Sequence, residues 1–281
     1  MRSIQASLIT DTVAGLFMEA NYCIGEDVSQ AISTALVQET SPQGRDTLRQ
    51  ISDNYRIAAS QRVAICQDTG MSVIFAELGQ EVHIENGGFE EAIQQGVREA
   101  YLQGYLRKSI VTDPLFDRVN TKDNTPSVIH TRIVPGSHLH LTAIAKGFGS
   151  ENMSALKMLV PADGIAGVKQ FVLETVERAG PNPCPPIIVG VGIGGSFEQA
   201  AIMAKRATAL PLDTHNTDAR YATLEEELFT AINALGIGPG GTGGRTTALK
   251  VHTLFAPTHI AGLPVAVNIC CHAARHLSAT I

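Results

Sequence analysis

The stretch Ile187-Ile188-Val189-Gly190-Val191-Gly192-Ile193-Gly194-Gly195-Ser196 decides the fold class. Its first three residues are apolar and β-branched, which predicts a buried strand over 187–189. The glycines that follow predict a turn over 190–195, and Ser196 is a favoured residue for opening a helix. A strand, a tight glycine turn and a helix in succession are typical of an α/β protein.

The same alternation extends over the rest of the chain. The spacing of apolar residues predicts helices over 10–37, 45–60, 89–105 and 163–179, and Thr223 with Glu226 predicts the capping box of another helix. Strands are expected over 63–66, 71–75, 127–134, 138–146 and 263–269. No internal repeat or low-complexity linker divides the chain. We therefore expect mixed helices and short sheets in one large domain over residues 1–281, with two lobes around the functional site as an alternative.

Composition excludes several classes of partner. The chain has 281 residues, 44% of them hydrophobic and 17% charged, with a net charge of −6 and no block of basic residues. This balance argues against nucleic acid or an anionic membrane as a partner. The N-terminal residues lack the apolar core of a signal peptide, and five cysteines are an odd number. We expect a cytoplasmic protein that does not bind membranes.

Two glycine-rich segments resemble nucleotide-binding motifs. The first, 190–195, satisfies G-x-G-x-x-G, but Asp213 is a poor candidate for the acidic residue that should follow a second strand. A turn that lets the backbone approach a ligand or a neighbouring strand is favoured, and a nucleotide-binding oxidoreductase is a remote alternative. The second, 238–247, has Arg245 where a phosphate-binding loop needs lysine. We expect this loop to present Arg245 or Thr246 to an active site or to a partner subunit.

Histidines offer little support for a zinc site. His138 and His140 share one face of a predicted strand, but no carboxylate or third histidine follows at ligand spacing. A zinc site at these residues is therefore disfavoured.

Three cysteines lie beside residues suited to chemistry. Cys66 precedes Gln67-Asp68, Cys184 lies between prolines, and Cys271 follows Cys270 and precedes a histidine. Iron–sulfur clusters normally take four cysteine ligands, so three would leave one iron open to substrate. By count alone, five cysteines in such a chain are more often small buried hydrophobic residues. Adjacent Cys270 and Cys271 cannot easily both reach one iron.

Five motifs together resemble one known family, the class I, iron–sulfur-dependent fumarate hydratases. The resemblance is to the α subunit of the two-subunit form, which is similar to the tartrate dehydratase α subunit, and it runs in order along nearly the whole chain. The motifs are Cys66-Gln67-Asp68-Thr69-Gly70, Pro181-Asn182-Pro183-Cys184-Pro185-Pro186, Gly192-Ile193-Gly194-Gly195-Ser196, Gly244-Arg245-Thr246-Thr247 and Cys271-His272-Ala273-Ala274-Arg275.

The resemblance implies a 4Fe-4S cluster with one open iron site and a substrate pocket beside it. Cys271 is preferred to Cys270 because the family's ligand directly precedes a His/Trp-Ala pair, here His272-Ala273. The segment 146–150 departs from the family, since Phe148 stands in a loop expected to be all glycine. The implied cluster ligands are Cys66, Cys184 and Cys271, and the implied pocket residues are Gln67, Asp68, Arg107, Gly149 and His259.

The implied function is that of a hydro-lyase α subunit, which reversibly hydrates fumarate to (S)-malate, a reaction of the tricarboxylic acid cycle. A β subunit would supply the remaining substrate contacts, and we expect a higher oligomer. Asp68, two residues from an implied ligand, is expected to act as acid or base, with capping of the Thr69-Gly70 turn as its alternative role. Arg107 is expected to bind the distal carboxylate bidentately, with a solvated helix-end charge as its alternative. Other possible functions are dehydration of tartrate or a mesaconate-type substrate, and a cluster-free interaction subunit.

Overall fold

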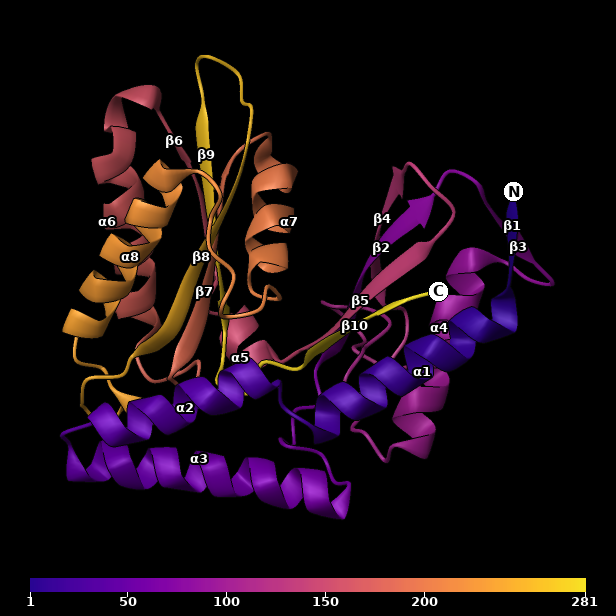
Figure 1. Ribbon diagram of the computed structural model, residues 1–281, viewed down its shortest axis with the longest axis horizontal. Helices are drawn as coiled ribbons and strands as arrows, with labels where there is room; N and C mark the ends of the chain where they lie inside the picture. Colours follow the sequence, from indigo (N-terminus) through magenta and orange to yellow (C-terminus); the bar gives the residue numbers. More distant parts are fainter. The chain divides into compact units, whose positions relative to one another are not determined.

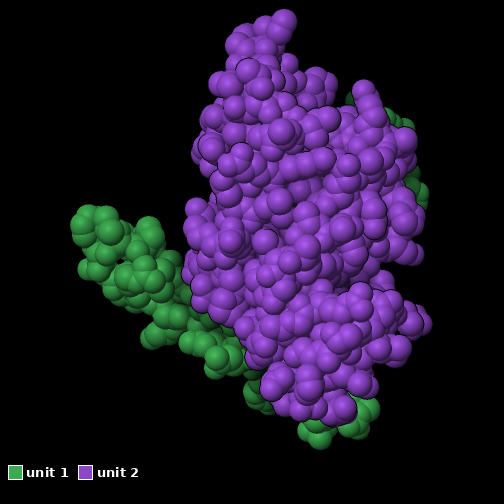
Figure 2. All heavy atoms as spheres, turned by 90° about the vertical axis from the view of Figure 1, so that its left-hand side faces the viewer, with its two compact units in different colours: residues 1–24, 55–148, 275–281 green, residues 25–54, 149–274 purple.

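The computed structural model describes residues 1–281, which divide into two compact units. Unit 1 consists of residues 1–24, 55–148 and 275–281, and unit 2 consists of residues 25–54 and 149–274 (Figure 2). Each unit has a four-stranded mixed sheet and a hydrophobic core. The predicted α/β class is therefore confirmed.

Unit 1 is built on a sheet with the strand order β10-β5-β2-β4. Strand β2 is parallel to β4 and antiparallel to β5, which in turn is antiparallel to β10. Two helices pack against each other, and the first of them also packs on β5 and β10 (Figure 1). A parallel pair of short strands, β1 and β3, completes the unit. The elements are β1 (Arg2–Gln5), α1 (Ala6–Tyr22), β2 (Met71–Gly79), β3 (Val82–Glu85), α4 (Phe89–Gln103), β4 (Val128–Val134), β5 (Leu139–Lys146) and β10 (His276–Thr280).

Unit 2 is built on a sheet with the strand order β6-β9-β7-β8, in which only β7 and β8 are parallel. Helices α6 and α8 cover one face of this sheet and α7 covers the other (Figure 1). Two helices are divided between the units, α3 before Tyr55 and α5 after Phe148. The elements are α2 (Glu26–Gln38), α3 (Pro42–Gln61), α5 (Phe148–Glu151), β6 (Ala155–Leu159), a 3-10 turn (Pro161–Asp163), α6 (Gly164–Ala179), β7 (Ile187–Gly194), α7 (Phe197–Ala207), α8 (Ala219–Ala234), a 3-10 turn (Pro239–Gly241), β8 (Ala248–Ala256) and β9 (Leu263–Cys270).

Six predicted elements agree with the structure to within a few residues. The helices predicted over 45–60, 89–105 and 163–179 are α3, α4 and α6, and the strands predicted over 127–134, 138–146 and 263–269 are β4, β5 and β9. The strand predicted over 71–75 begins β2, which continues to Gly79. None of the helices has the length and apolar character needed to cross a bilayer.

Three other predictions are wrong. Residues 10–37 form two helices rather than one, because the backbone leaves the helical conformation at Cys23 and Gly25. Residues 63–66 form no strand, since the N–H of Ile65 donates to the carbonyl of Asn21 in α1 at 2.8 Å. Helix α8 begins before the predicted capping box, and its cap is the carboxylate of Asp218.

The predicted glycine turn at 190–195 is also wrong, because β7 continues through these residues to Gly194. Helix α7 lies against this strand at very short range. A Cβ on Gly190 would lie 2.1 Å from the carbonyl oxygen of Ala204, and a Cβ on Gly192 would lie 2.0 Å from that of Ala200. These glycines therefore let a helix approach a strand, and they do not form the loop that a nucleotide pyrophosphate requires.

Candidate functional site

Residues 66–70, here called the Cys66 loop, lead into β2 in unit 1. Both carboxylate oxygens of Asp68 accept backbone hydrogen bonds, Oδ1 from Gly70 at 3.0 Å and Oδ2 from Phe148 at 2.8 Å. Gly70 has a φ of +84°, and a Cβ there would lie 2.6 Å from the backbone of Ala145. The structure thus shows the turn-capping role of Asp68 and fixes its carboxylate in one orientation.

Arg107 belongs to the same neighbourhood as the Cys66 loop. The hydroxyl of Thr69 donates to the carbonyl of Arg107 at 3.0 Å, while the side chain of Arg107 is exposed. The buried hydroxyl of Tyr101 donates to the carbonyls of Thr69 and Gly70 at 2.8 and 2.9 Å. Burial raises the pKa of Tyr101 to about 12, so this donor keeps its proton at neutral pH. Unit 1 therefore gathers Cys66, Gln67, Asp68 and Arg107 around one short loop.

Unit 2 brings Cys184 and Cys271 to the same end of its sheet. Strand β7 begins three residues after Cys184, and Cys271 directly follows β9. The two strands are antiparallel, and Ile188 pairs with Cys270. Cys184 is exposed and Cys271 is half-buried, whereas Cys270 is 7% exposed in the core.

Gly149 lies beside the segment that carries Cys184. A Cβ on Gly149 would lie 3.6 Å from the carbonyl oxygen of Asn182, two residues before Cys184. Phe148, which departs from the all-glycine expectation, begins the one-turn helix α5 and is 45% exposed. Three of the expected site residues therefore lie in unit 2, namely Gly149, Cys184 and Cys271.

His259 lies at the opposite end of the same sheet, in the loop that connects β8 to β9. The whole of β9, from Leu263 to Cys270, separates it from Cys271. A strand rises by about 3.3 Å per residue, so this separation is roughly 23 Å. Within unit 2, the structure does not bring His259 to Cys184 or Cys271.

The potential metal-ligating side chains do not converge on one point in this structure. No group of three or more histidine, cysteine, aspartate and glutamate side chains is arranged to hold a metal ion, and the cysteines form no disulfide. The ring of His138 is hydrogen-bonded to Arg2 and that of His140 to Thr280, both at 2.8 Å. Of the three cysteines implied as ligands, Cys66 belongs to unit 1 and the other two belong to unit 2.

The second glycine-rich loop encloses a carboxylate that the sequence analysis missed. Glu39, which is 3% exposed, accepts hydrogen bonds of 2.9–3.1 Å from the backbone N–H groups of Thr40, Ser41, Arg245 and Thr246. A Cβ on Gly244 would lie 2.8 Å from Oε1 of Glu39. The loop thus binds an anion from its own chain, and the only sequence signal was a glutamate at the end of a helical pattern.

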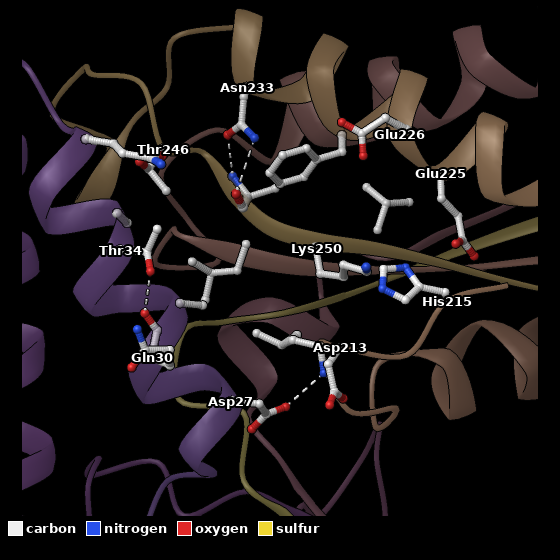
Figure 3. A pocket seen from close by; sticks show the side chains of 18 of the residues that line it. Asp27, Gln30, Thr34, Asp213, His215, Glu225, Glu226, Asn233, Thr246 and Lys250 are labelled. Atoms are coloured by element: carbon white, nitrogen blue, oxygen red, sulfur yellow. Dashed lines mark hydrogen bonds between the residues drawn. The ribbon is translucent and has the colours of Figure 1, made fainter.

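A cavity of about 890 Å³ lies in unit 2 between α2, α8, β8 and the segment that follows α7 (Figure 3). Arg245 and Thr246 line it, but none of the residues implied as ligands or substrate contacts does. Two of its carboxylates already serve the fold. Asp27 accepts from the N–H of Leu212 at 2.8 Å, and Glu225 accepts from the N–H of Thr253 at 2.6 Å. Its charged and polar lining includes Glu26, Asp27, Gln30, Asp213, His215, Glu225, Glu226, Asn233 and Lys250.

Comparison with known proteins identifies the family. The model of the fumarate hydratase (Fumerase) family matches residues 10–280. The chain belongs to this family.

Three relatives extend this result. The chain is 42% identical over 272 residues to the putative L(+)-tartrate dehydratase subunit alpha of Methanocaldococcus jannaschii, covering 95% of each chain. It is 31% identical over 271 residues to the L(+)-tartrate dehydratase subunits alpha of Escherichia coli and Shigella sonnei, covering 95% of this chain and 88% of theirs. The family consists of hydro-lyases, and all three relatives are named as α subunits.

Proposed function

We propose that the chain is the α subunit of a 4Fe-4S hydro-lyase that acts on a dicarboxylate together with a β subunit. The observation that carries this proposal is the family match over residues 10–280. The relatives support the need for a β subunit, since they are named as α subunits and have nearly the same extent as this chain. An oxygen-sensitive cluster in a chain without disulfides also fits the reducing cytoplasm.

Cys66, Cys184 and Cys271 are the proposed cluster ligands. Thiolates are the soft ligands that iron–sulfur clusters require. The structure supports the choice of Cys271, because Cys270 is buried in β9 while Cys271 follows the strand at the same end as Cys184. When bound, the cluster supplies a Lewis-acidic iron that makes the substrate hydroxyl a better leaving group.

The residues of the Cys66 loop have separate proposed roles. Asp68 moves a proton at the carbon beside the reacting hydroxyl, and its two backbone hydrogen bonds keep the carboxylate oriented for this task. Gln67 is exposed next to it and is proposed to hydrogen-bond the substrate. The exposed guanidinium of Arg107 binds the distal carboxylate bidentately.

Gly149 and His259 require different explanations. Gly149 lies beside the Cys184 segment, where the absence of a side chain leaves the backbone open to substrate. His259 is too far from Cys271 in unit 2 to share one substrate with it. Its proposed substrate contact therefore requires a second copy of the chain, in agreement with the expected higher oligomer.

Two substrates are proposed. The sequence motifs favour hydration of fumarate to (S)-malate, which would place the enzyme in the tricarboxylic acid cycle. The names of the relatives favour dehydration of L(+)-tartrate. Hydration of fumarate forms a C–O bond and adds a proton to the neighbouring carbon, and dehydration of tartrate breaks a C–O bond and removes a proton from the neighbouring carbon. The same side chains can therefore serve either reaction.

The test is to co-express the chain with a candidate β subunit, purify the complex without oxygen and compare kcat/KM for (S)-malate, fumarate and L(+)-tartrate. We expect a brown complex with hydro-lyase activity on one of these substrates. Substitution of Cys66, Cys184 or Cys271 by serine should abolish cluster retention, while Cys270→Ser should keep it. A colourless anaerobic complex would contradict the cluster, and loss of colour in Cys270→Ser would contradict the choice of ligand.

A further inference from the structure

Arg275 is a buried cation in unit 1 that is neither a proposed cluster ligand nor a proposed substrate contact. Its residue is 2% exposed, and it lies directly before β10. Its carbonyl accepts from the N–H of Ala145, which extends the pairing of β10 with β5. An arginine keeps its charge even when buried, and its Nε has no hydrogen-bond partner. Burying such a group is unfavourable, so core packing alone does not account for it.

The guanidinium of Arg275 is directed at Asp68. Its Nη1 donates to the carbonyl oxygen of Asp68 and to Oδ1 of Asn21, the latter at 3.4 Å. The position that a Cβ on Gly147 would occupy is 3.1 Å from Nη2 of Arg275 and 3.3 Å from Oδ2 of Asp68. Gly147 therefore has no side chain that would separate the guanidinium from the carboxylate.

Asn21 holds the other end of the same segment. It is fully buried in α1, and its Nδ2 donates to the carbonyl of Phe17 at 2.9 Å. The backbone carbonyl of Asn21 accepts from the N–H of Ile65 at 2.8 Å, and Ile65 directly precedes Cys66. The short segment 66–68 is thus tied to α1 at its start and to Arg275 at its end.

We propose that Arg275 is a positioning residue, which together with Asn21 clamps the segment 66–68 so that the thiol of Cys66 and the carboxylate of Asp68 keep one relative geometry. This inference rests on the proposed function, because it assigns those two groups to the reaction. Arg275 acts through the loop and does not itself touch the substrate. The clamp matters because a displacement of about 1 Å in a reacting group can reduce a rate about 100-fold.

The clamp can be tested first in the chain without cluster. The variants are Arg275→Lys and Arg275→Gln, with Arg132→Lys and Arg132→Gln as matched controls on the exposed edge strand β4 of the same sheet. We expect both Arg275 variants to speed amide exchange of Gly70 and Phe148, whose N–H groups bind Asp68, by about tenfold or more. Alkylation of Cys66 should accelerate in parallel, and the Arg132 variants should match the wild type.

The second test measures steady-state kinetics of the anaerobic complex with the β subunit, normalised to cluster content. Arg275→Gln should lower kcat by about 100-fold and change KM by less than about threefold, because substrate binding is retained while the reacting groups are misplaced. Arg275→Lys should recover part of kcat, since its ammonium can still donate to the carbonyl of Asp68.

The outcomes separate this inference from the proposed function. A wild-type complex without hydro-lyase activity overturns both. An active wild type with Arg275→Gln indistinguishable from Arg132→Gln in exchange and in kcat overturns the inference alone, as does a rise in KM at unchanged kcat. If Arg275→Gln does not fold, Arg275→Lys decides, and a loss of kcat that merely follows its folded fraction contradicts the positioning role.

Discussion

Two glycine-rich segments of unit 2 look alike in sequence and differ completely in structure. Residues 190–194 lie in strand β7, where Gly190 and Gly192 face the backbone of α7. Residues 238–244 form a loop in which all five glycines have positive φ, and its end wraps the carboxylate of Glu39. In the first segment glycine is required for space, and in the second it is required for backbone conformation.

Neither segment has the free glycine loop that binding of a nucleotide phosphate requires. In β7 the backbone N–H groups are committed to the neighbouring strands, and the missing side chains make room for a helix. In the second loop the N–H groups that could bind a phosphate already donate hydrogen bonds to the carboxylate of Glu39. Glycine spacing alone does not distinguish these cases from a ligand site.

The largest effect is expected from Gly192→Ala. The new methyl group would lie 2.0 Å from the carbonyl of Ala200, which is backbone and can move only if α7 leaves the sheet. We expect the free energy of unfolding to fall by about 3 kcal/mol or more, measured by urea denaturation or seen as loss of folded protein. A variant within about 1 kcal/mol of the wild type would show that space is not what the glycine provides.

A smaller loss is expected from Glu39→Gln. The amide keeps the shape of the side chain but loses the charge and one of the two acceptor oxygens, so N–H groups of the loop remain unsatisfied. Hydrogen bonds to charged groups contribute about 1.5–3 kcal/mol, and we expect a loss of roughly 2 kcal/mol in urea denaturation. The matched control is Glu227→Gln, which removes the ion pair of the exposed Glu227 with the half-buried Lys169 and should cost less than about 1 kcal/mol. Equal losses of unfolding free energy in the two variants would show that the hydrogen bonds between the loop and Glu39 do not stabilise the fold.

Lowering the pH should reduce the free energy of unfolding in two steps, first through the region around Gly190 and then through the loop around Glu39. Next to Gly190, burial lowers the pKa of His252 from 6.5 to about 4. Since the unfolded chain binds that proton more readily, the stability from neutral His252 is present above pH 6.5 and is lost as the pH falls towards 4. At Glu39, burial opposes ionisation, but the backbone hydrogen bonds outweigh it and lower the pKa below 4.5.

The contribution of Glu39 to the free energy of unfolding is therefore present above the pKa that Glu39 has in the unfolded chain. It is lost only as the pH falls below 4.5. Urea denaturation across the pH range should show the first loss in the wild type and in Glu39→Gln alike. The second loss should be absent from Glu39→Gln. A Glu39→Gln curve parallel to that of the wild type below pH 4.5 would rule out this assignment.

The smallest effect is expected from Gly15→Ala, and its sign is opposite. Gly15 lies exposed in α1, has no positive φ, and a Cβ there would meet nothing within 4 Å. Neither space nor conformation requires glycine, so alanine should stabilise the helix by about 0.5–1 kcal/mol in urea denaturation. A loss of stability in this variant would mean that a contact not evident from the fold depends on Gly15.

Local sequence patterns predicted those helices and strands whose conformation does not depend on a neighbouring element. The apolar periodicity of α3, α4 and α6 and the β-propensity of β4, β5 and β9 agree with the structure. Periodicity did not reveal the break at Cys23 and Gly25, since the apolar pattern continues across it. The glycines of β7 were assigned to a turn because their requirement comes from α7, which local sequence does not place.

The sequence by itself determined the family, the local chemistry around each cysteine and the residues that can serve as ligands, acids or anion binders. Only the tertiary structure decided which of them meet. Strand register brings Cys184 to the same end as Cys271 and leaves His259 at the other, and folding brings Arg275 to Asp68 across 207 residues of chain. The physical reason is that side-chain chemistry and helical or strand period are local properties, whereas burial and hydrogen-bond partners depend on segments that meet only in the folded chain.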